Sequence, residues 1–154
     1  MTFNVEGFTQ NFFYLSRLLR TSPPKLIFLQ VIWAKYSEES SMNNILQDYS
    51  MQISTPDMFT PPEDLLNSSD HIWHGAAIMW HTSLNSHITN LKTKNTRFTS
   101  IRISVQDQKL VAISVYFPTS GKDDEFVDCT VELINFVNEV KKSDESVSQE
   151  TASF

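Results

Sequence analysis

KLIFLQVI, residues 25–32, is the stretch of the sequence that decides the fold. It is apolar at almost every position and follows directly on Pro23 and Pro24. A run of this length is too short for a typical helix, and prolines at its border favour a strand. Nearly continuous apolar sequence is typical of strands that are buried on both faces. The sequence therefore predicts a central strand here.

Helical and strand patterns alternate on either side of this run. Apolar residues recur at helical spacing over residues 8–20, and Ser22, which precedes a proline, ends that predicted helix. Strands are predicted over residues 49–54, 75–81, 96–105 and 110–117, the last two joined as a hairpin by Asp107 and Gln108. A weaker helix is predicted over residues 41–47, a long loop over residues 55–72, and a final helix from Asp123 to the lysine pair at residues 141–142.

This order of elements predicts an α/β domain over residues 1–142, in which helices cover a mixed sheet. Residues 143–154 (SDESVSQETASF) are polar and acidic, and they are expected to form a disordered tail.

The composition restricts the classes of function. The chain has 154 residues, a formal net charge of -6 and a pI of about 5.1, whereas a dedicated nucleic-acid binder usually carries a basic excess. Any contact with DNA is therefore expected to use a local basic patch or a bound cation. The single cysteine, Cys129, excludes an internal disulfide and suits a reducing compartment. No apolar run approaches the roughly 20 residues that span a bilayer, so an intracellular protein without a membrane anchor is expected.

Four short stretches occur in an order that resembles the endonuclease/exonuclease/phosphatase superfamily. They are NVEG at residues 4–7, LIFLQ at residues 26–30 with Trp33 downstream, GAAIMW at residues 75–80, and VYFP at residues 115–118. The chain resembles most the apurinic-endonuclease-like domain of non-LTR retrotransposons. The resemblance implies an α/β sandwich of two facing sheets and hydrolysis of a phosphodiester with a divalent cation, usually magnesium.

The resemblance also implies roles for individual residues. Asn4 matches an asparagine near the metal and the phosphate, Tyr116 matches a tyrosine that contacts the scissile phosphate, and Gln30 matches the glutamine before the metal-binding glutamate. The next position is Val31, which has no oxygen and cannot bind a hard cation. Asn4 and Tyr116 are therefore expected to be vestigial site residues, and no cofactor is expected in this chain.

The family pattern continues beyond the final helix with a Gly-Asp-x-Asn stretch and a later Asp-His pair, which this sequence does not contain. These segments carry the general base and the phosphate-binding histidine of the family. The chain is therefore expected to be a truncated, partial sandwich whose second sheet is incomplete. An incomplete sheet would leave one flank of the core uncovered and could promote self-association.

Basic residues gather in one part of the sequence, at Lys92, Lys94, Arg97 and Arg102. Either a phosphate-contacting loop or a solvated hairpin accounts for this cluster, and the acidic total favours the solvated hairpin. The four histidines match no zinc-binding pattern. The sequence therefore predicts a degenerate endonuclease-like domain without catalysis. The alternatives are a non-catalytic DNA- or protein-binding module and an unselected relic.

Overall fold

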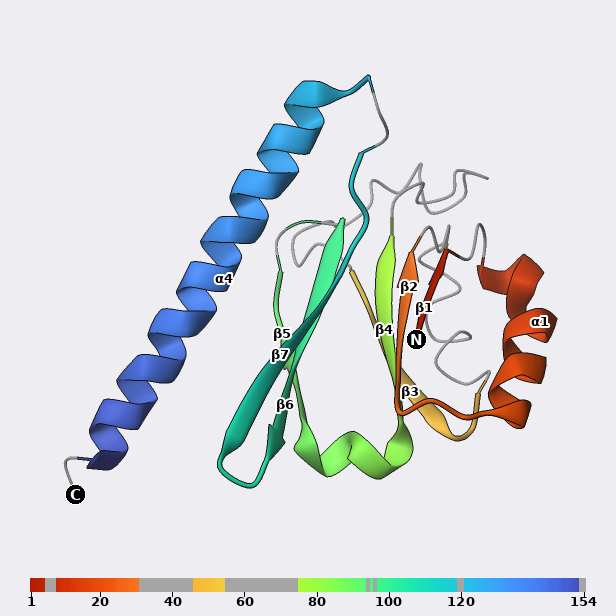
Figure 1. The fold of residues 1–154 in the computed structure, drawn as a ribbon, viewed down its shortest axis with the longest axis horizontal. Helices are drawn as coiled ribbons and strands as arrows, with labels where there is room; N and C mark the ends of the chain where they lie inside the picture. Colours follow the sequence, from red (N-terminus) through yellow and green to blue (C-terminus); the bar gives the residue numbers. More distant parts are fainter. Residues whose placement is uncertain are drawn as a thin grey trace, which may run out of the picture. The chain divides into compact units, whose positions relative to one another are not determined.

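The computed structural model describes residues 1–4, 8–30, 46–54, 75–93, 95, 97–118 and 121–152, and these form two compact units (Figure 1). The first unit is Met1–Tyr116 and the second is Phe117–Phe154. The boundary between them lies near the end of the predicted hairpin, and the extent of the domain over residues 1–142 stays a prediction. The predicted helix over residues 41–47 and the predicted loop over residues 55–72 fall mostly or wholly outside the described residues.

The first unit contains a mixed four-stranded sheet whose order is β1-β2-β4-β3. Its strands are β1 (Thr2–Asn4), β2 (Leu26–Gln30), β3 (Tyr49–Ile53) and β4 (Ala76–His81). β1 runs parallel to β2, and β4 pairs antiparallel with both β2 and β3. The expectation of a mixed sheet is therefore confirmed, with the predicted central strand inside the sheet.

A second, antiparallel sheet has the order β5-β6-β7. Its strands are β5 (Ile88–Leu91), β6 (Phe98–Val105) and β7 (Gln108–Val115), and a 3-10 helix at Thr82–His87 joins β4 to β5. The predicted hairpin is present, but its turn consists of Gln106 and Asp107, one residue earlier than expected. Val105 pairs with Gln108, and Gln106 adopts a left-handed backbone with a φ of 54°. A positive φ in the first turn residue suits the right-handed twist of the two strands.

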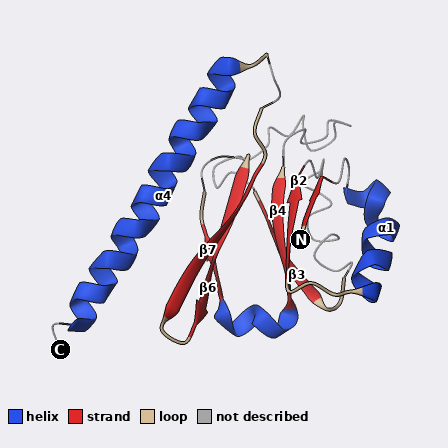
Figure 2. Ribbon diagram, viewed as in Figure 1, coloured by secondary structure: helices blue, strands red, loops and turns tan. Residues whose placement is uncertain are grey.

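The four-stranded sheet lies between helix α1 (Phe8–Thr21) and the three-stranded sheet (Figure 2). On one side, Leu15 and Leu19 of α1 pack with Ile27 and Leu29 of β2. On the other side, side chains from β4, β6 and β7 form a second cluster, namely Ile78, Trp80, Ile101, Ile103 and Ala112, with Leu26 and Phe28 of β2 packed against it. Because alternate residues of β2 face the two clusters, the prediction of a strand covered on both faces is confirmed.

Hydrogen bonds tie the two sheets together. The side-chain amide of Gln52 in β3 donates to the backbone oxygen of Leu91 in β5 over 3.3 Å. The hydroxyl of Ser114 in β7 is buried and donates to the backbone oxygen of Leu29 in β2 over 3.1 Å. The α/β class and the sandwich of facing sheets expected from the sequence are confirmed.

The second unit contains helix α4, Asp123–Ala152. It begins at Asp123, as expected from the carboxylates in its first turn, which favour a helix N-terminus. It does not end at the lysine pair but continues through most of the segment expected to be a disordered tail. Residues 141–152 contain no proline or glycine, so the sequence has no strong stop signal there. None of the helices in the described part of the chain is long and apolar enough to cross a membrane.

Candidate functional site

Four residues from neighbouring strands form a row along one end of the four-stranded sheet. Asn4 and Gln30, the last residues of β1 and β2, are paired, and Gln30 is paired with Ala76 at the start of β4. Ser54, which follows β3, completes the row: its backbone N–H donates to the Ala76 oxygen over 2.8 Å, and its hydroxyl accepts from the Ala76 N–H over 3.0 Å. We call these four residues the strand-end row. It brings together Asn4 and Gln30, which lie far apart in the sequence.

Tyr116, the second predicted site residue, lies just beyond β7. Its backbone N–H donates to the Arg97 oxygen over 2.8 Å, which continues the pairing of β7 with β6. Ser114, two residues earlier, is bonded to Leu29, the neighbour of Gln30. β1, β2 and β7 therefore end toward the same side of the fold (Figure 1). The geometry places Asn4, Gln30 and Tyr116 at this common end, while their roles stay predictions.

The donor chemistry of the strand-end row is neutral. Asn4 and Gln30 supply amides, Ser54 a hydroxyl that is already bonded to Ala76, and Ala76 only a methyl group. Magnesium is held in proteins through one or more carboxylates, because their negative charge offsets the loss of hydration. Val31, at the position of the family's glutamate, lies outside the described residues. Within the described ranges, no group of three or more His, Cys, Asp or Glu residues could hold a metal ion. These residues do not fit a hard divalent cation.

The predicted basic cluster is only partly exposed. Lys92 is exposed, and Arg97 is half-buried in the connection between β5 and β6. The backbone N–H of Arg97 donates to the Asn95 side chain over 2.7 Å, and its oxygen accepts from Tyr116. Lys94 lies outside the described residues. Arg97 therefore has a clear structural role beside Tyr116, and contact of the cluster with nucleic acid stays a prediction.

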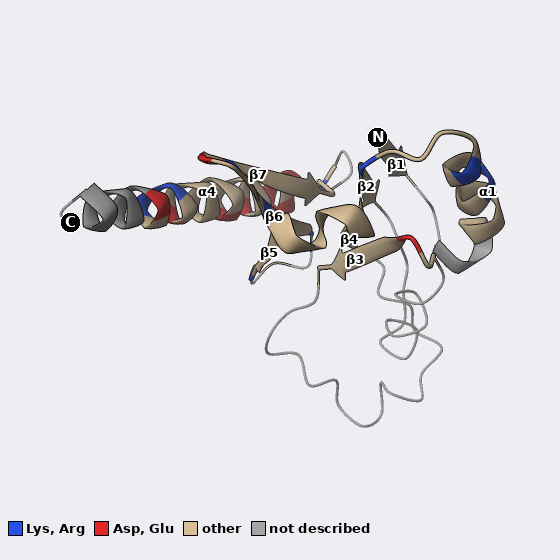
Figure 3. Cartoon of the chain, turned by 90° about the horizontal axis from the view of Figure 1, so that it is seen from below, with Lys and Arg blue, Asp and Glu red and all other residues tan. Residues whose placement is uncertain are grey.

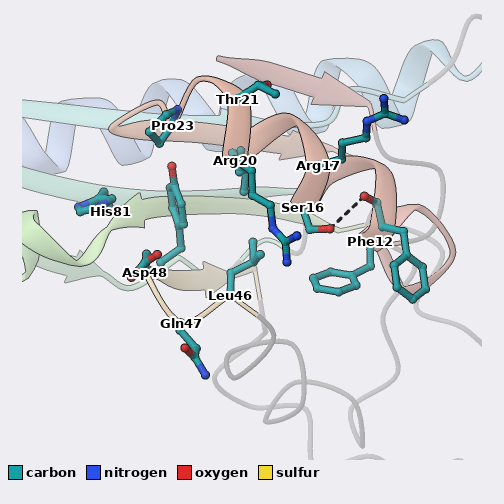
Figure 4. Close-up of a pocket in the computed structure, with 13 residues that line it drawn as sticks. Phe12, Ser16, Arg17, Arg20, Thr21, Pro23, Leu46, Gln47, Asp48 and His81 are labelled. Carbon is teal, nitrogen blue, oxygen red and sulfur yellow. Dashed lines mark hydrogen bonds between the residues drawn. The ribbon is translucent and has the colours of Figure 1, made fainter.

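A groove of about 1040 Å³ lies between α1 and the start of β3, and the sequence did not point to it (Figure 4). Arg17 and Arg20 line it from α1, together with Phe12 and the 82% exposed Phe13. The blue part of α1 in Figure 3 marks its basic positions, and the arginines in the sequence of α1 are these two. The only signal in the sequence was their spacing of three residues, which puts them on one face of a helix. No residue of the strand-end row lines this groove.

Tyr49 forms the opposite wall of the groove. Its hydroxyl donates to the Pro24 oxygen over 2.8 Å, and its ring meets that of His81 edge to face at 5.6 Å. Burial, and then the negative charge of the neighbouring Asp48, raise the pKa of Tyr49 above its ordinary value. Tyr49 therefore keeps its proton at neutral pH and anchors the end of α1 to β3.

No protein-family model matches the sequence, and no curated protein matches it. Solved structures do match the fold. The AP endonuclease LMAP from Leishmania major aligns with a TM-score of 0.57 and 12% identity over 78% of this chain and 40% of its own. The endonuclease domain of TRAS1, a telomere-specific non-LTR retrotransposon, aligns with a TM-score of 0.55 and 10% identity over 86% of this chain and 51% of its own.

The 3'-5' exonuclease NExo from Neisseria meningitidis aligns with a TM-score of 0.57 and 15% identity over 92% of this chain and 52% of its own. The chain thus spans about half the length of these structures. A likeness at identities this low shows the fold alone, so the chain shares the fold of these endonuclease and exonuclease structures.

Proposed function

We propose that this chain is a degenerate endonuclease-like domain that does not hydrolyse phosphodiesters. The observation that carries the proposal is the neutral strand-end row, together with valine at the position where the family's metal-binding glutamate is expected. A metal-dependent hydrolase needs a carboxylate to attract the cation and to hold it against the phosphate. Amide oxygens alone supply no negative charge, so binding of magnesium is expected to be too weak to support the reaction.

The same residues leave the acid–base part of the reaction without a candidate. Asn4 and Gln30 supply amides and Tyr116 a phenol hydroxyl, whereas a general base in such a reaction is usually a carboxylate or an imidazole. Asn4 and Tyr116 could still orient a phosphate group by hydrogen bonds, but orientation without an activated water does not cleave the bond. This supports the proposal that both residues are vestigial.

Nicking of supercoiled plasmid DNA in the presence of magnesium tests this proposal. The purified chain is expected to leave the plasmid supercoiled, while an active apurinic endonuclease nicks it under the same conditions. A folded state confirmed by circular dichroism excludes a trivial loss of activity. Magnesium-dependent nicking that is lost in Asn4→Ala, but kept in the matched control Asn90→Ala on β5, would show that the proposal is wrong.

Restoring one carboxylate is expected to be insufficient. Val31→Glu returns the ligand type that the family uses, so it should strengthen magnesium binding measured by calorimetry. It should not restore nicking, because no residue of the strand-end row can act as the general base. Plasmid nicking by Val31→Glu would mean that a base elsewhere in the chain serves the site.

The second candidate function is binding of single-stranded DNA without cleavage. Structures with the same fold have been solved with a product DNA hairpin, for NExo, and with a single-strand DNA product, for TDP2 from D. rerio. The observation that favours DNA binding here is the groove beside α1, where Arg17 and Arg20 lie next to the exposed ring of Phe13. Cationic side chains next to exposed aromatic rings are typical of surfaces that bind single strands.

Fluorescence anisotropy with a labelled single-stranded oligonucleotide tests this second candidate. Affinity is expected to fall with added salt and to drop in the double variant Arg17→Ala/Arg20→Ala. The control is Lys141→Ala/Lys142→Ala on α4, which removes the same charge far along the sequence and should keep the affinity. Equal losses of affinity in both double variants would show that binding depends on the net charge of the chain and not on the groove. No binding at low salt would leave a protein-binding module and an unselected relic as the remaining alternatives.

A further inference from the structure

The edge of the three-stranded sheet formed by β7 is open in the described part of the chain. β7 pairs with β6 along all eight of its residues and with no other described strand, so it ends the sheet on that side. An edge strand presents a row of backbone N–H and C=O groups that can pair with another strand. Figure 2 shows β6 and β7 as the two long strands of this sheet.

The pairing with β6 fixes which backbone groups point outward. Residues of an antiparallel pair alternate between hydrogen-bonded and non-hydrogen-bonded positions. Tyr116 donates its N–H to Arg97, and the register continues from this pair to Ser114 with Thr99 and Ala112 with Ile101. The even-numbered residues of β7 therefore bond to β6. The N–H and C=O groups of Val111 and Ile113 point away from β6, toward the open edge.

The sequence of this edge lacks most of the features that prevent strands from pairing. β7 contains no proline or glycine, and Lys109 is its only charged residue. Leu110 is 61% exposed, an unusual position for a leucine within a strand. Long edge strands in soluble proteins are normally protected by prolines, bulges or several charges.

We propose that β7 is a dimerisation edge, on which a second copy of this chain adds its own β7 in antiparallel orientation. A second copy fits because the edge is self-complementary about a two-fold axis through Ala112. In that register Val111 lies opposite Ile113 of the second copy, and the two such pairs exchange two bonds each, giving roughly four hydrogen bonds at the centre of the interface.

Charge and length favour a register whose axis lies near the middle of β7. Because the odd-numbered residues of β7 direct their backbone groups outward, odd-numbered residues of one copy must pair with odd-numbered residues of the other. The two-fold axis must therefore pass through a residue and not between two residues. An axis at Lys109 would place two lysines opposite each other, which is unfavourable across a strand pair. An axis at Ala112 separates the lysines, placing each opposite Val115, and pairs residues 109–115 of both strands, a length that no other allowed register of β7 exceeds. Strand pairing alone buries less area than a standard interface, so a weak dimer in the micromolar range is expected.

Amide hydrogen exchange followed by NMR tests the pairing residue by residue in the unmodified chain. At low micromolar concentration, the amides of Ala112 and Ser114 should be protected, while those of Val111 and Ile113 exchange fast. At submillimolar concentration, the amides of Val111 and Ile113 should become protected about tenfold or more, while Asn90 on the opposite edge does not change. Exchange at Val111 and Ile113 that does not depend on concentration would overturn the proposal.

Sedimentation velocity with proline variants gives an independent test. Val111→Pro removes an outward N–H, which an edge strand tolerates, and is expected to yield a monomer. The matched control is Asn90→Pro on β5. Asn90 pairs with Ile101, whose bonds go to β7, so the Asn90 N–H also points outward. This control should still dimerise.

A charge variant covers the case in which Val111→Pro does not fold. Leu110→Lys changes an exposed side chain and should keep the fold, but it adds a second positive charge to each edge and should weaken the dimer about tenfold. A wild-type chain that stays monomeric at submillimolar concentration would refute the proposal. Dimers of equal strength in Leu110→Lys, Val111→Pro and Asn90→Pro would refute it as well.

Discussion

Truncation of Ile101 to alanine tests whether the two sheets share one core. Ile101 lies in the middle of β6, is fully buried and packs in the cluster that contains Ile78 and Trp80 of β4. If the sheets face each other as described, its side chain fills the space between them. The variant Ile101→Ala then leaves a cavity that neither sheet can close without moving against the other.

The expected cost follows from this burial. Removing a fully buried isoleucine side chain costs about 2–5 kcal/mol, the sum of lost transfer energy and the cavity that remains. We expect about 3 kcal/mol, because the site is walled by strands on both sides. For a domain of this size such a loss lowers the melting temperature by about 10 °C. The control is Val105→Ala at the end of the same strand, where the side chain is 46% exposed and the expected cost is about 0.5 kcal/mol.

Urea unfolding followed by tryptophan fluorescence measures both variants, with protein at low micromolar concentration so that association does not contribute. Trp80 lies in the same cluster and reports on it directly. The slope of the unfolding transition should stay unchanged in both variants. The difference in the free energy of unfolding is then seen in the urea midpoint alone. A midpoint for Ile101→Ala that equals that of Val105→Ala would show that the sheets do not pack against each other, and the strand-end row would then lose its connection to Tyr116.

Three further changes probe single contacts. Tyr49→Phe removes the hydrogen bond to Pro24 and should cost about 1 kcal/mol at pH 7 in urea unfolding. Because the pKa of Tyr49 is raised in the folded state, its contribution to the free energy of unfolding is complete below pH 10 and is lost as the pH rises further. The difference in free energy of unfolding between the variant and the wild type should therefore narrow at high pH. Ser114→Ala should cost about 1 kcal/mol by removing the bond to Leu29, seen as a lower urea midpoint. Gln106→Gly should raise thermal stability by up to about 1 kcal/mol, because its φ of 54° suits glycine better than glutamine; a lower melting temperature would contradict this reading of the turn.

The strands could be predicted from the sequence because their periodicity reports burial directly. The run at residues 25–32 was apolar on both faces, and the structure places alternate residues of β2 in two different clusters. The alternation in β6 likewise gave its bounds closely. The turn was displaced by one residue because Gln106, unlike glycine or asparagine, carries no signal for a positive φ. The end of α4 was missed because a polar, acidic segment without breakers is compatible with both helix and disorder.

The candidate site was predictable only in part. The resemblance identified Asn4 and Tyr116, and the structure places both where strands end toward one side of the fold. Ser54 could not be identified in advance, because its place in the strand-end row depends on bonds to Ala76, a residue 22 positions away. The groove beside α1 was missed for the same reason. Its walls come from α1 and the start of β3, which lie far apart in the sequence, and no local pattern reports that these segments meet.

Backbone groups, with the hydroxyls of Ser54 and Ser114, make the contacts that position the strand-end row and Tyr116. Asn4 is positioned by strand pairing with Gln30, and Tyr116 by its backbone bond to Arg97 and by Ser114 nearby. A carboxylate at the end of β2 could thus be replaced by valine without removing any of these contacts. Loss of catalysis and preservation of the fold are therefore compatible in this chain, and the nicking assay and the unfolding of Ile101→Ala test the two independently.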